Sequence, residues 1–241
     1  MESRFVTFVA ASAVFMTVLL LLDRDGLPQQ LGFGTATALF LWLFARTSQV
    51  PLRQIVCCVI VATIGEVVLS IGWGLYSYRH AVIPLYVPPG HGLFYTLAAE
   101  TARQQFVRMR GAMITRSVVI AGSILAVAFL AFKHDVWGFL WWVGALALIA
   151  VSKNRLLLSA CFVYTIILEL VGTAIGNWRW TPEVPFLGLH SANPPSGVGI
   201  LYILLDLIVV AITANIQKGN RFHAETQRSR SFFLRVLRGS A

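Results

Sequence analysis

One pattern occurs twice in this chain, as CVIVATIGEVVLSIGWGLYSY at residues 58–78 and as CFVYTIILELVGTAIGNWRW at residues 161–180. Cys58, Glu66 and Ile71-Gly72 of the first copy correspond to Cys161, Glu169 and Ile175-Gly176 of the second. The order continues with Pro84, Pro88-Pro89 and Phe94-Tyr95 after the first copy and with Pro185, Pro194-Pro195 and Leu201-Tyr202 after the second. A shared order of this length indicates a duplicated unit with small insertions in its loops.

The composition is that of an integral membrane protein. Of the 241 residues, 57% are hydrophobic and only 12% are charged, whereas soluble domains are about a quarter charged. Apolar stretches of roughly 17–22 residues recur, long enough to cross a hydrocarbon core about 30 Å thick. We therefore expect an all-α, polytopic membrane helix bundle with about eight spans. The expected spans are 5–22, 31–46, 54–75, 92–102, 117–132, 136–152, 156–176 and 198–217.

The basic residues indicate the orientation, because Lys and Arg concentrate on the cytoplasmic side of membrane proteins. With these spans, only Arg24, Arg79, Lys133 and Arg179 of the 19 basic residues fall on the opposite side. We therefore expect a multi-pass protein of the cell membrane with both termini in the cytoplasm. An even number of spans per copy gives both copies the same orientation. Two parallel four-span repeats, 1–111 and 112–217, would then be related by an axis along the membrane normal.

Residues 218–241 form a basic cytoplasmic tail beside the last span. Such a segment typically contacts anionic lipid headgroups. No folded basic module for nucleic acid is visible, so we expect no nucleic-acid partner. The sequence leaves open a homo-oligomer or an envelope complex.

The two long loops, 77–91 and 177–197, fall together on the non-cytoplasmic side. Each contains a Pro-Pro pair close to Gly, which fixes the backbone of a turn. Irregular backbone at membrane depth needs protein or a cavity around it. We therefore expect ordered caps or re-entrant segments that lead into the next helix.

Glu66 and Glu169 are the leading catalytic candidates. Each lies inside a predicted span, where a carboxylate normally faces a cavity or a partner. Two interpretations remain: the pair acts as an acid and a base, or it only holds helices together by hydrogen bonds. His91 and His190 lie in the outer loops and would assist proton transfer or bond to the loops.

Metal and disulfide chemistry are not expected. The chain has no HxxH, HxxxH or ExxH spacing, which zinc sites commonly use. Cys57, Cys58 and Cys161 lie inside predicted spans and form no CxxC motif. We therefore expect no metal ion and no cofactor.

Aromatic and polar residues beside the glutamates would bind the substrate. The aromatic residues are typical of the belt at a membrane interface, but they would equally form the wall of a site for a long apolar ligand. The two arginines would hold a headgroup phosphate or extend to the interface. The expected substrate-binding residues are Trp73, Tyr76, Tyr78, Trp178, Trp180, Asn193, Arg79 and Arg179.

The first copy resembles the lycopene cyclase domain of heterodimeric and fused carotenoid cyclases. The residues that carry the resemblance are Glu66, Gly72-Trp73, Tyr76, Pro84 and 87–95. This copy also resembles, more loosely, the carotenoid hydratases. The resemblance implies paired membrane units with an acidic residue in a span of each, and an isoprenoid cyclase- or hydratase-like lyase or isomerase. Where the cyclase pattern has Pro-x-Glu-Glu, this chain has Pro88-Pro89-Gly90-His91. Glu66 and Glu169 would therefore have to supply the acid.

The leading hypothesis is a membrane protein that binds or acts on an isoprenoid or another long-chain lipid. Its cavity would lie between the two repeats, with the paired glutamates as acid and base. One rival is a small transporter or flippase in which the carboxylates couple transport to protons. Another is a non-catalytic subunit of a cell-envelope assembly.

Overall fold

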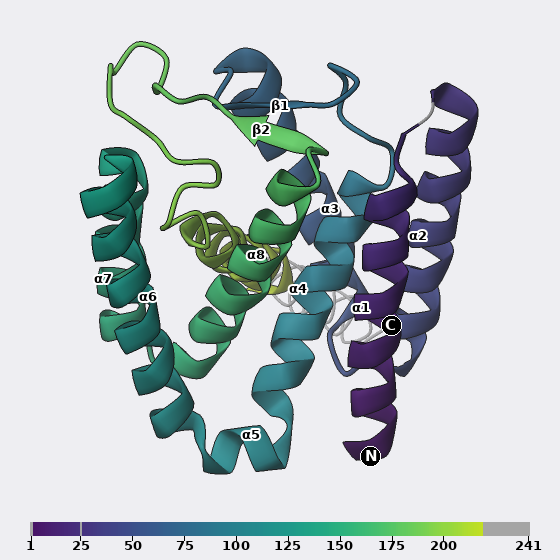
Figure 1. The fold of residues 1–241 in the computed structure, drawn as a ribbon. Coiled ribbons are helices and arrows are strands. Elements are labelled where there is room, and N and C mark those ends of the chain that lie inside the picture. The colour runs from purple at the N-terminus through teal and green to yellow at the C-terminus, as the bar shows by residue number, and fades with distance from the viewer. Residues whose placement is uncertain (1, 25, 219–241) are drawn as a thin grey trace, which may run out of the picture.

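The computed structural model describes residues 2–24 and 26–218, which are mainly helical (Figure 1). The helices are α1 (Glu2–Leu22), α2 (Leu27–Thr47), α3 (Leu52–Glu66), the π-helical turn η1 (Val67–Gly72), α4 (Val87–Arg103), α5 (Gln105–Met109), α6 (Gly111–Lys133), α7 (Val136–Val151), α8 (Arg155–Ala174) and a final helix, Ile200–Lys218. Two short strands, β1 (Tyr76–Tyr78) and β2 (Trp178–Trp180), pair in a two-stranded sheet. The predicted all-α class is confirmed. Most of the predicted basic tail, 219–241, lies outside the described residues.

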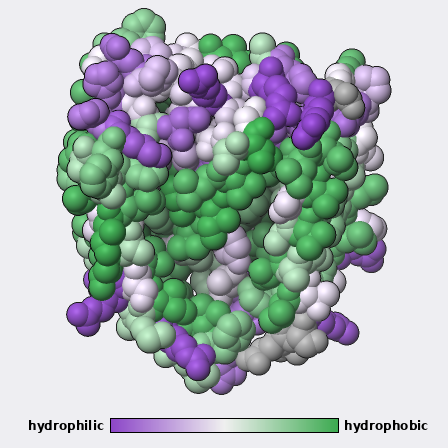
Figure 2. Space-filling model, in the orientation of Figure 1, coloured by the Kyte–Doolittle hydropathy of each residue, from purple (hydrophilic) through white to green (hydrophobic). Residues whose placement is uncertain are grey.

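Within the described chain, five helices are long and apolar enough to cross a membrane, which supports the prediction of a membrane protein. They are Arg4–Leu22 in α1, Leu52–Gly72 in α3 and η1, Gly111–Lys133, Arg155–Ala174 and Ile200–Lys218, whereas α7 is apolar but shorter. Figure 2 shows a broad hydrophobic belt on the visible face, with hydrophilic residues gathered toward its upper and lower edges. An apolar surface of this extent belongs against lipid rather than water.

Helix α4 contacts α2, α3 and α8 and so occupies the centre of the bundle. Gly92 makes this close packing possible, because a Cβ atom there would lie 2.8 Å from a Leu41 methyl and 2.9 Å from a Val59 methyl. Small residues commonly allow such approaches between membrane helices. Helix α1 is joined to α2 by the stacked rings Phe8–Phe44 and Phe15–Phe40.

The two strands join segments that are far apart in the sequence. They pair antiparallel, with Tyr76 opposite Trp180, Ser77 opposite Arg179 and Tyr78 opposite Trp178. Side chains alternate along a strand, so the four large aromatic residues are buried while Ser77 and Arg179 face outward. We call Tyr76, Tyr78, Trp178 and Trp180 the aromatic roof.

The π-helical turn η1 changes how the two copies of the pattern correspond. Gly74 and Gly176 have left-handed backbones, with φ of 76° and 77°, and each lies two residues before its strand. By geometry the equivalent pair is therefore Gly74 and Gly176, whereas sequence matching paired Gly72 with Gly176. A π-helical turn contains more residues than an α-helical one, so η1 lengthens the path from Glu66 to β1.

The first Pro-Pro pair lies inside a helix, which differs from the predicted loop over 77–91 and the predicted span from 92. Pro88, Pro89 and His91 belong to the start of α4. Proline is tolerated there because the first N–H groups of a helix have no carbonyl partner within it. The second pair, Pro194-Pro195, lies in irregular backbone.

Asp135, directly before α7, anchors the irregular segment that carries Pro194-Pro195. Its buried carboxylate accepts hydrogen bonds from the backbone N–H groups of Gly138 at 3.1 Å, Ala192 at 2.8 Å and Ser196 at 2.8 Å. A buried loop needs such partners because its N–H groups have no ladder or helix to bond to. The segment is thereby held against α7.

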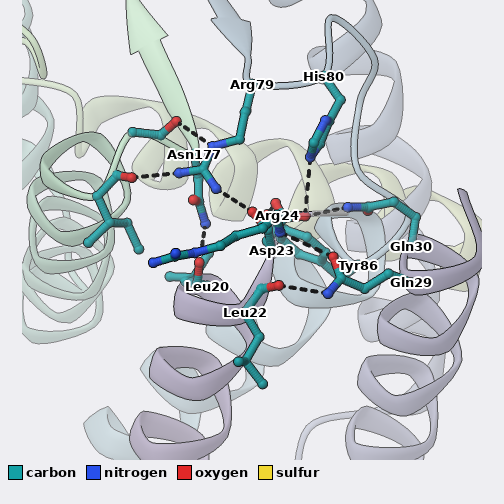
Figure 3. A network of polar contacts seen from close by, with 12 residues as sticks. Leu20, Leu22, Asp23, Arg24, Gln29, Gln30, Arg79, His80, Tyr86 and Asn177 are labelled. Atoms are coloured by element: carbon teal, nitrogen blue, oxygen red, sulfur yellow. Dashed lines mark hydrogen bonds and ion pairs between the residues drawn. The ribbon is translucent and has the colours of Figure 1, made fainter. Parts of the chain in front are cut away.

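Asp23, directly after α1, holds the other outer loop in a comparable network (Figure 3). Its buried carboxylate accepts hydrogen bonds from the Gln30 amide and, at 2.7 Å, from the Tyr86 hydroxyl. Beside it, the Asn177 amide donates to the Leu20 carbonyl at 2.8 Å. The end of α1 is therefore bonded to α2, to the start of α4 and to the segment after α8.

We expect Asp135→Ala to lower the free energy of unfolding by about 2–5 kcal/mol, because it leaves three buried N–H groups without an acceptor. Thermal unfolding of the purified protein in detergent measures the effect. Glu183→Ala is the control, since Glu183 is an exposed acid on the same outer side. Equal melting temperatures for the two variants would contradict the anchoring role of Asp135.

Candidate functional site

A cavity of about 400 Å³ lies under the aromatic roof, among α1, α3, α4, α8 and the final helix. We call it the outer cavity, where 'outer' means the end of the molecule that carries β1 and β2 and 'inner' the opposite end. Glu66, Glu169 and His91 line it together with the four roof side chains. Most of the remaining wall is apolar, with residues such as Met16 and Leu168.

The outer cavity opens sideways between α3 and the final helix. Ile64 and Val68 line it and are 58% and 53% exposed on the molecule, and Ile208 across the opening is 45% exposed. Side chains that both line a cavity and lie on the surface mark its mouth. Because this mouth lies within two of the apolar helices, it faces the apolar surface of the protein.

Glu66 is hydrogen-bonded to three side chains. Its Oε2 atom accepts from the hydroxyls of Tyr76 at 2.8 Å and Tyr78 at 2.7 Å. Its Oε1 atom lies 2.9 Å from His91 Nε2. Bonds of this kind stabilise an ionised carboxylate in an apolar environment.

Glu169 has a simpler set of partners. Its Oε2 atom accepts hydrogen bonds from the indole N–H groups of Trp178 at 2.8 Å and Trp180 at 2.9 Å. No hydrogen bond to Oε1 occurs within the part of the chain that the structure describes. Each glutamate is thus held by two alternate residues of the strand that follows it, but only Glu66 has a histidine partner.

Gly172 fixes the position of the roof above Glu169. A Cβ atom at Gly172 would overlap the indole ring of Trp178, so the missing side chain lets the ring lie on α8. On the other strand, burial and then the neighbouring Glu66 carboxylate raise the pKa of Tyr76 and of Tyr78 well above the usual value. Both phenols therefore remain protonated donors at neutral pH.

His91 connects Glu66 to the final helix. Its ring stacks on Tyr202 with 5.2 Å between centroids. Its Nδ1 atom is buried and has no hydrogen-bond partner among the described residues. A buried nitrogen without a partner is uncommon in a stable fold and is often functional. A histidine whose other nitrogen contacts a carboxylate has the arrangement used for general acid/base chemistry.

Three other predicted site residues bond to the outer loops and do not line the outer cavity. His190 is exposed, forms a backbone bridge with Glu183, and accepts a bond from the Trp137 N–H at 2.9 Å. The Trp73 indole donates to the Pro185 carbonyl at 3.1 Å, and Asn193 Oδ1 accepts from the Trp180 N–H at 2.9 Å.

The two predicted phosphate-binding arginines also lie away from the outer cavity. The Arg79 guanidinium donates to the backbone carbonyls of Ile175 at 2.6 Å, Gly176 at 3.2 Å and Asp23. It therefore caps the carboxyl ends of α1 and α8 (Figure 3), which leaves few donors for a phosphate. Arg179 is exposed because it occupies the outward position of β2.

Tyr202 lines the outer cavity, although the sequence analysis did not select it as a site residue. The repeated pattern could have indicated it, because Tyr202 corresponds to Tyr95 of the first copy. Asp206, one helical turn further along, is 4% exposed, and its carboxylate bonds to no residue that the structure describes. No three His, Cys, Asp or Glu side chains within 2–24 and 26–218 are grouped as metal ligands.

Comparison with known proteins found no match: no protein-family model, no curated protein and no solved structure matches this chain.

We expect Tyr78→Phe to lower the free energy of unfolding by about 1.5–3 kcal/mol, because it removes a hydrogen bond to a buried carboxylate. Thermal unfolding of Tyr78→Phe, Glu66→Leu and the double variant forms a double-mutant cycle. In the Glu66→Leu background the loss should be smaller, since no acceptor remains. Ser77→Ala, on the outward face of the same strand, is the control. An equal loss in both backgrounds would show that the bond does not stabilise the site.

Proposed function

We propose that the chain is an eight-span protein of the cell membrane, built from two parallel four-span repeats, 1–111 and 112–217, with both termini in the cytoplasm. Two corresponding arrangements support the repeats: each glutamate accepts bonds from its own following strand, and Asp23 and Asp135 each anchor an outer loop. The antiparallel pairing of β1 with β2 is what a two-fold axis through the sheet would produce.

We further propose that the outer cavity binds an isoprenoid or another long-chain lipid. One observation carries this proposal: two carboxylates face a mostly apolar cavity whose mouth lies on the apolar surface. An apolar chain would enter from the bilayer without crossing water, and its burial would supply the binding free energy. The few polar groups of the wall would then orient the reacting part of the ligand.

The sequence predicts Glu66 and Glu169 as acid and base. Because His91 Nε2 lies 2.9 Å from Glu66 Oε1, we assign the acid step to His91, which Glu66 positions, and keep Glu169 as the base. Protonation of a carbon–carbon double bond by His91 would form a carbocation, which the faces of the aromatic roof would stabilise. Loss of a neighbouring proton to Glu169 would form a new double bond and complete an isomerisation or cyclisation. Addition of water to the cation, with loss of one water proton to Glu169, would instead give hydration. In both cases return of the proton from Glu169 to His91 would restore the starting state. This is the reaction class that the resemblance to carotenoid cyclases and hydratases implies.

Glu66→Gln and Glu169→Gln test the acid/base proposal. Each is expected to lower turnover by about 10²–10⁴-fold, because a neutral amide lacks the charge that stabilises a protonated imidazole and does not accept a proton. Lipid and pigment profiles of cells with and without the protein provide the measurement. The variants should resemble cells that lack the protein, while the exposed-site control Glu183→Gln should resemble wild type.

Wild-type profiles from both variants would overturn the acid/base proposal. A ligand that is extracted unchanged from wild type and from both variants would instead favour transport or an assembly role.

Gly65→Phe tests whether the outer cavity is the binding site. Gly65 lines the cavity and nothing lies within 4 Å of the place where its Cβ would be, so the new ring should occupy the cavity without disturbing the fold. We expect mass spectrometry of the purified variant to find at least about tenfold less co-purified ligand than in wild type. Gly32→Phe is the matched control, because Gly32 has similar free space but does not line the cavity. Equal ligand in both variants would place the binding site elsewhere.

A further inference from the structure

A second hollow, of about 840 Å³, lies among α4, α5, α6 and the start of α8. In Figure 1, α5 links α4 to α6 at the end of the molecule opposite β1 and β2. Five basic side chains line this hollow, and no acidic residue is among its described lining. We call it the inner basic pocket. The five are Arg103, Arg108, Arg116, Lys153 and Arg155.

Two of the five cations have partners inside the protein. Arg103 Nη1 lies 3.5 Å from Oε1 of Glu100, and the same oxygen accepts bonds from the Ser48 hydroxyl at 2.8 Å and the Gln49 N–H at 2.7 Å. The Arg155 guanidinium donates to the Ala150 carbonyl at 2.7 Å, near the end of α7. These bonds hold both arginines in place at the edge of the pocket.

The other three cations, Arg108, Arg116 and Lys153, are exposed. Their side chains form no hydrogen bond or ion pair with any residue that the structure describes. Like charges gathered around one hollow repel one another, and an anion in the hollow would reduce this repulsion. The pocket therefore has an excess of positive charge that the described protein does not neutralise.

Two helices begin at the same hollow. Helix α6 starts at Gly111 and α8 at Arg155, and neither has a side-chain cap. The first N–H groups of a helix have no carbonyl partner within it, and the helix dipole makes this end positive. Gly111, Ala112 and Leu156, from these first turns, line the pocket. Uncapped helix starts and unpaired cations together form the environment that binds phosphate in many proteins.

We infer that the inner basic pocket binds the phosphate of an anionic ligand, either a phospholipid headgroup or a small soluble phosphate. Small residues such as Ala99 and Ala102 leave room for the phosphate, and Val119 and Leu157 provide apolar contacts beside it. The pocket shares no lining residue with the outer cavity, so this inference does not depend on the function proposed there.

The test compares two triple variants of the full chain in a non-ionic detergent. Arg108→Gln, Arg116→Gln and Lys153→Gln remove the unpaired cations of the pocket. Arg4→Gln, Arg46→Gln and Arg53→Gln remove the same charge from other helix ends. The probes are phosphatidylglycerol, with zwitterionic phosphatidylcholine of zero net charge as the comparison, and inorganic diphosphate. Binding is measured by native mass spectrometry and titration calorimetry.

We expect the pocket variant to lose affinity for the anionic probe by roughly tenfold or more, and the control variant to lose less than about threefold. Binding of phosphatidylglycerol alone would assign the lipid, whereas binding of diphosphate would assign a soluble phosphate. Equal losses in both variants, or no binding of either probe to wild type, would overturn the inference.

Folding of the pocket variant is tested separately by its melting temperature without ligand. This should equal or exceed that of wild type, because the substitutions remove like-charge repulsion. If the triple variant does not fold, Arg116→Gln alone must still weaken probe binding more than Arg53→Gln does, and a larger loss from Arg53→Gln would equally overturn the inference.

Discussion

A polar group inside the apolar belt must find its partner within the protein, because the surrounding lipid offers none. Glu66 and Glu169 lie on two of the helices that are long and apolar enough to cross a membrane, and the rest of the structure depends on how these two carboxylates find their partners. Each carboxylate accepts hydrogen bonds from two side chains of a short strand, and the two strands pair with each other. The roof of the outer cavity therefore follows from hydrogen-bonding two carboxylates on apolar helices, and its aromatic side chains form one wall of the cavity.

Much of this could be predicted from the sequence, because the responsible signals are local. Apolar runs predict the helices, and a glutamate inside such a run predicts a cavity or a partner. The spacing of Tyr76 and Tyr78, and of Trp178 and Trp180, places both members of each pair on one face of a strand. Local signals do not predict that the two strands pair, because pairing requires both loops to fold toward the same point.

Some residues have different roles in the structure from those that the sequence predicts, and the causes are contacts between segments distant in the sequence. The sequence predicts Arg79 as a phosphate ligand. In the structure two helices end beside it, and their free carbonyls accept hydrogen bonds from its guanidinium. His91 and His190 are both predicted in the two long loops, yet α4 begins before His91 and brings it to Glu66, while His190 stays in a loop. The extra length of η1 likewise shifts the matching of the two copies, because helix type is not evident from composition.

Each glutamate receives its donors from its own half of the chain. Tyr76, Tyr78 and His91 all follow Glu66 within 25 positions, and the two indoles follow Glu169 within 11. During synthesis, the first half can therefore satisfy its buried acid before any of the second half has been made. Pairing of β1 with β2 then joins two halves whose carboxylates each already have hydrogen-bond partners.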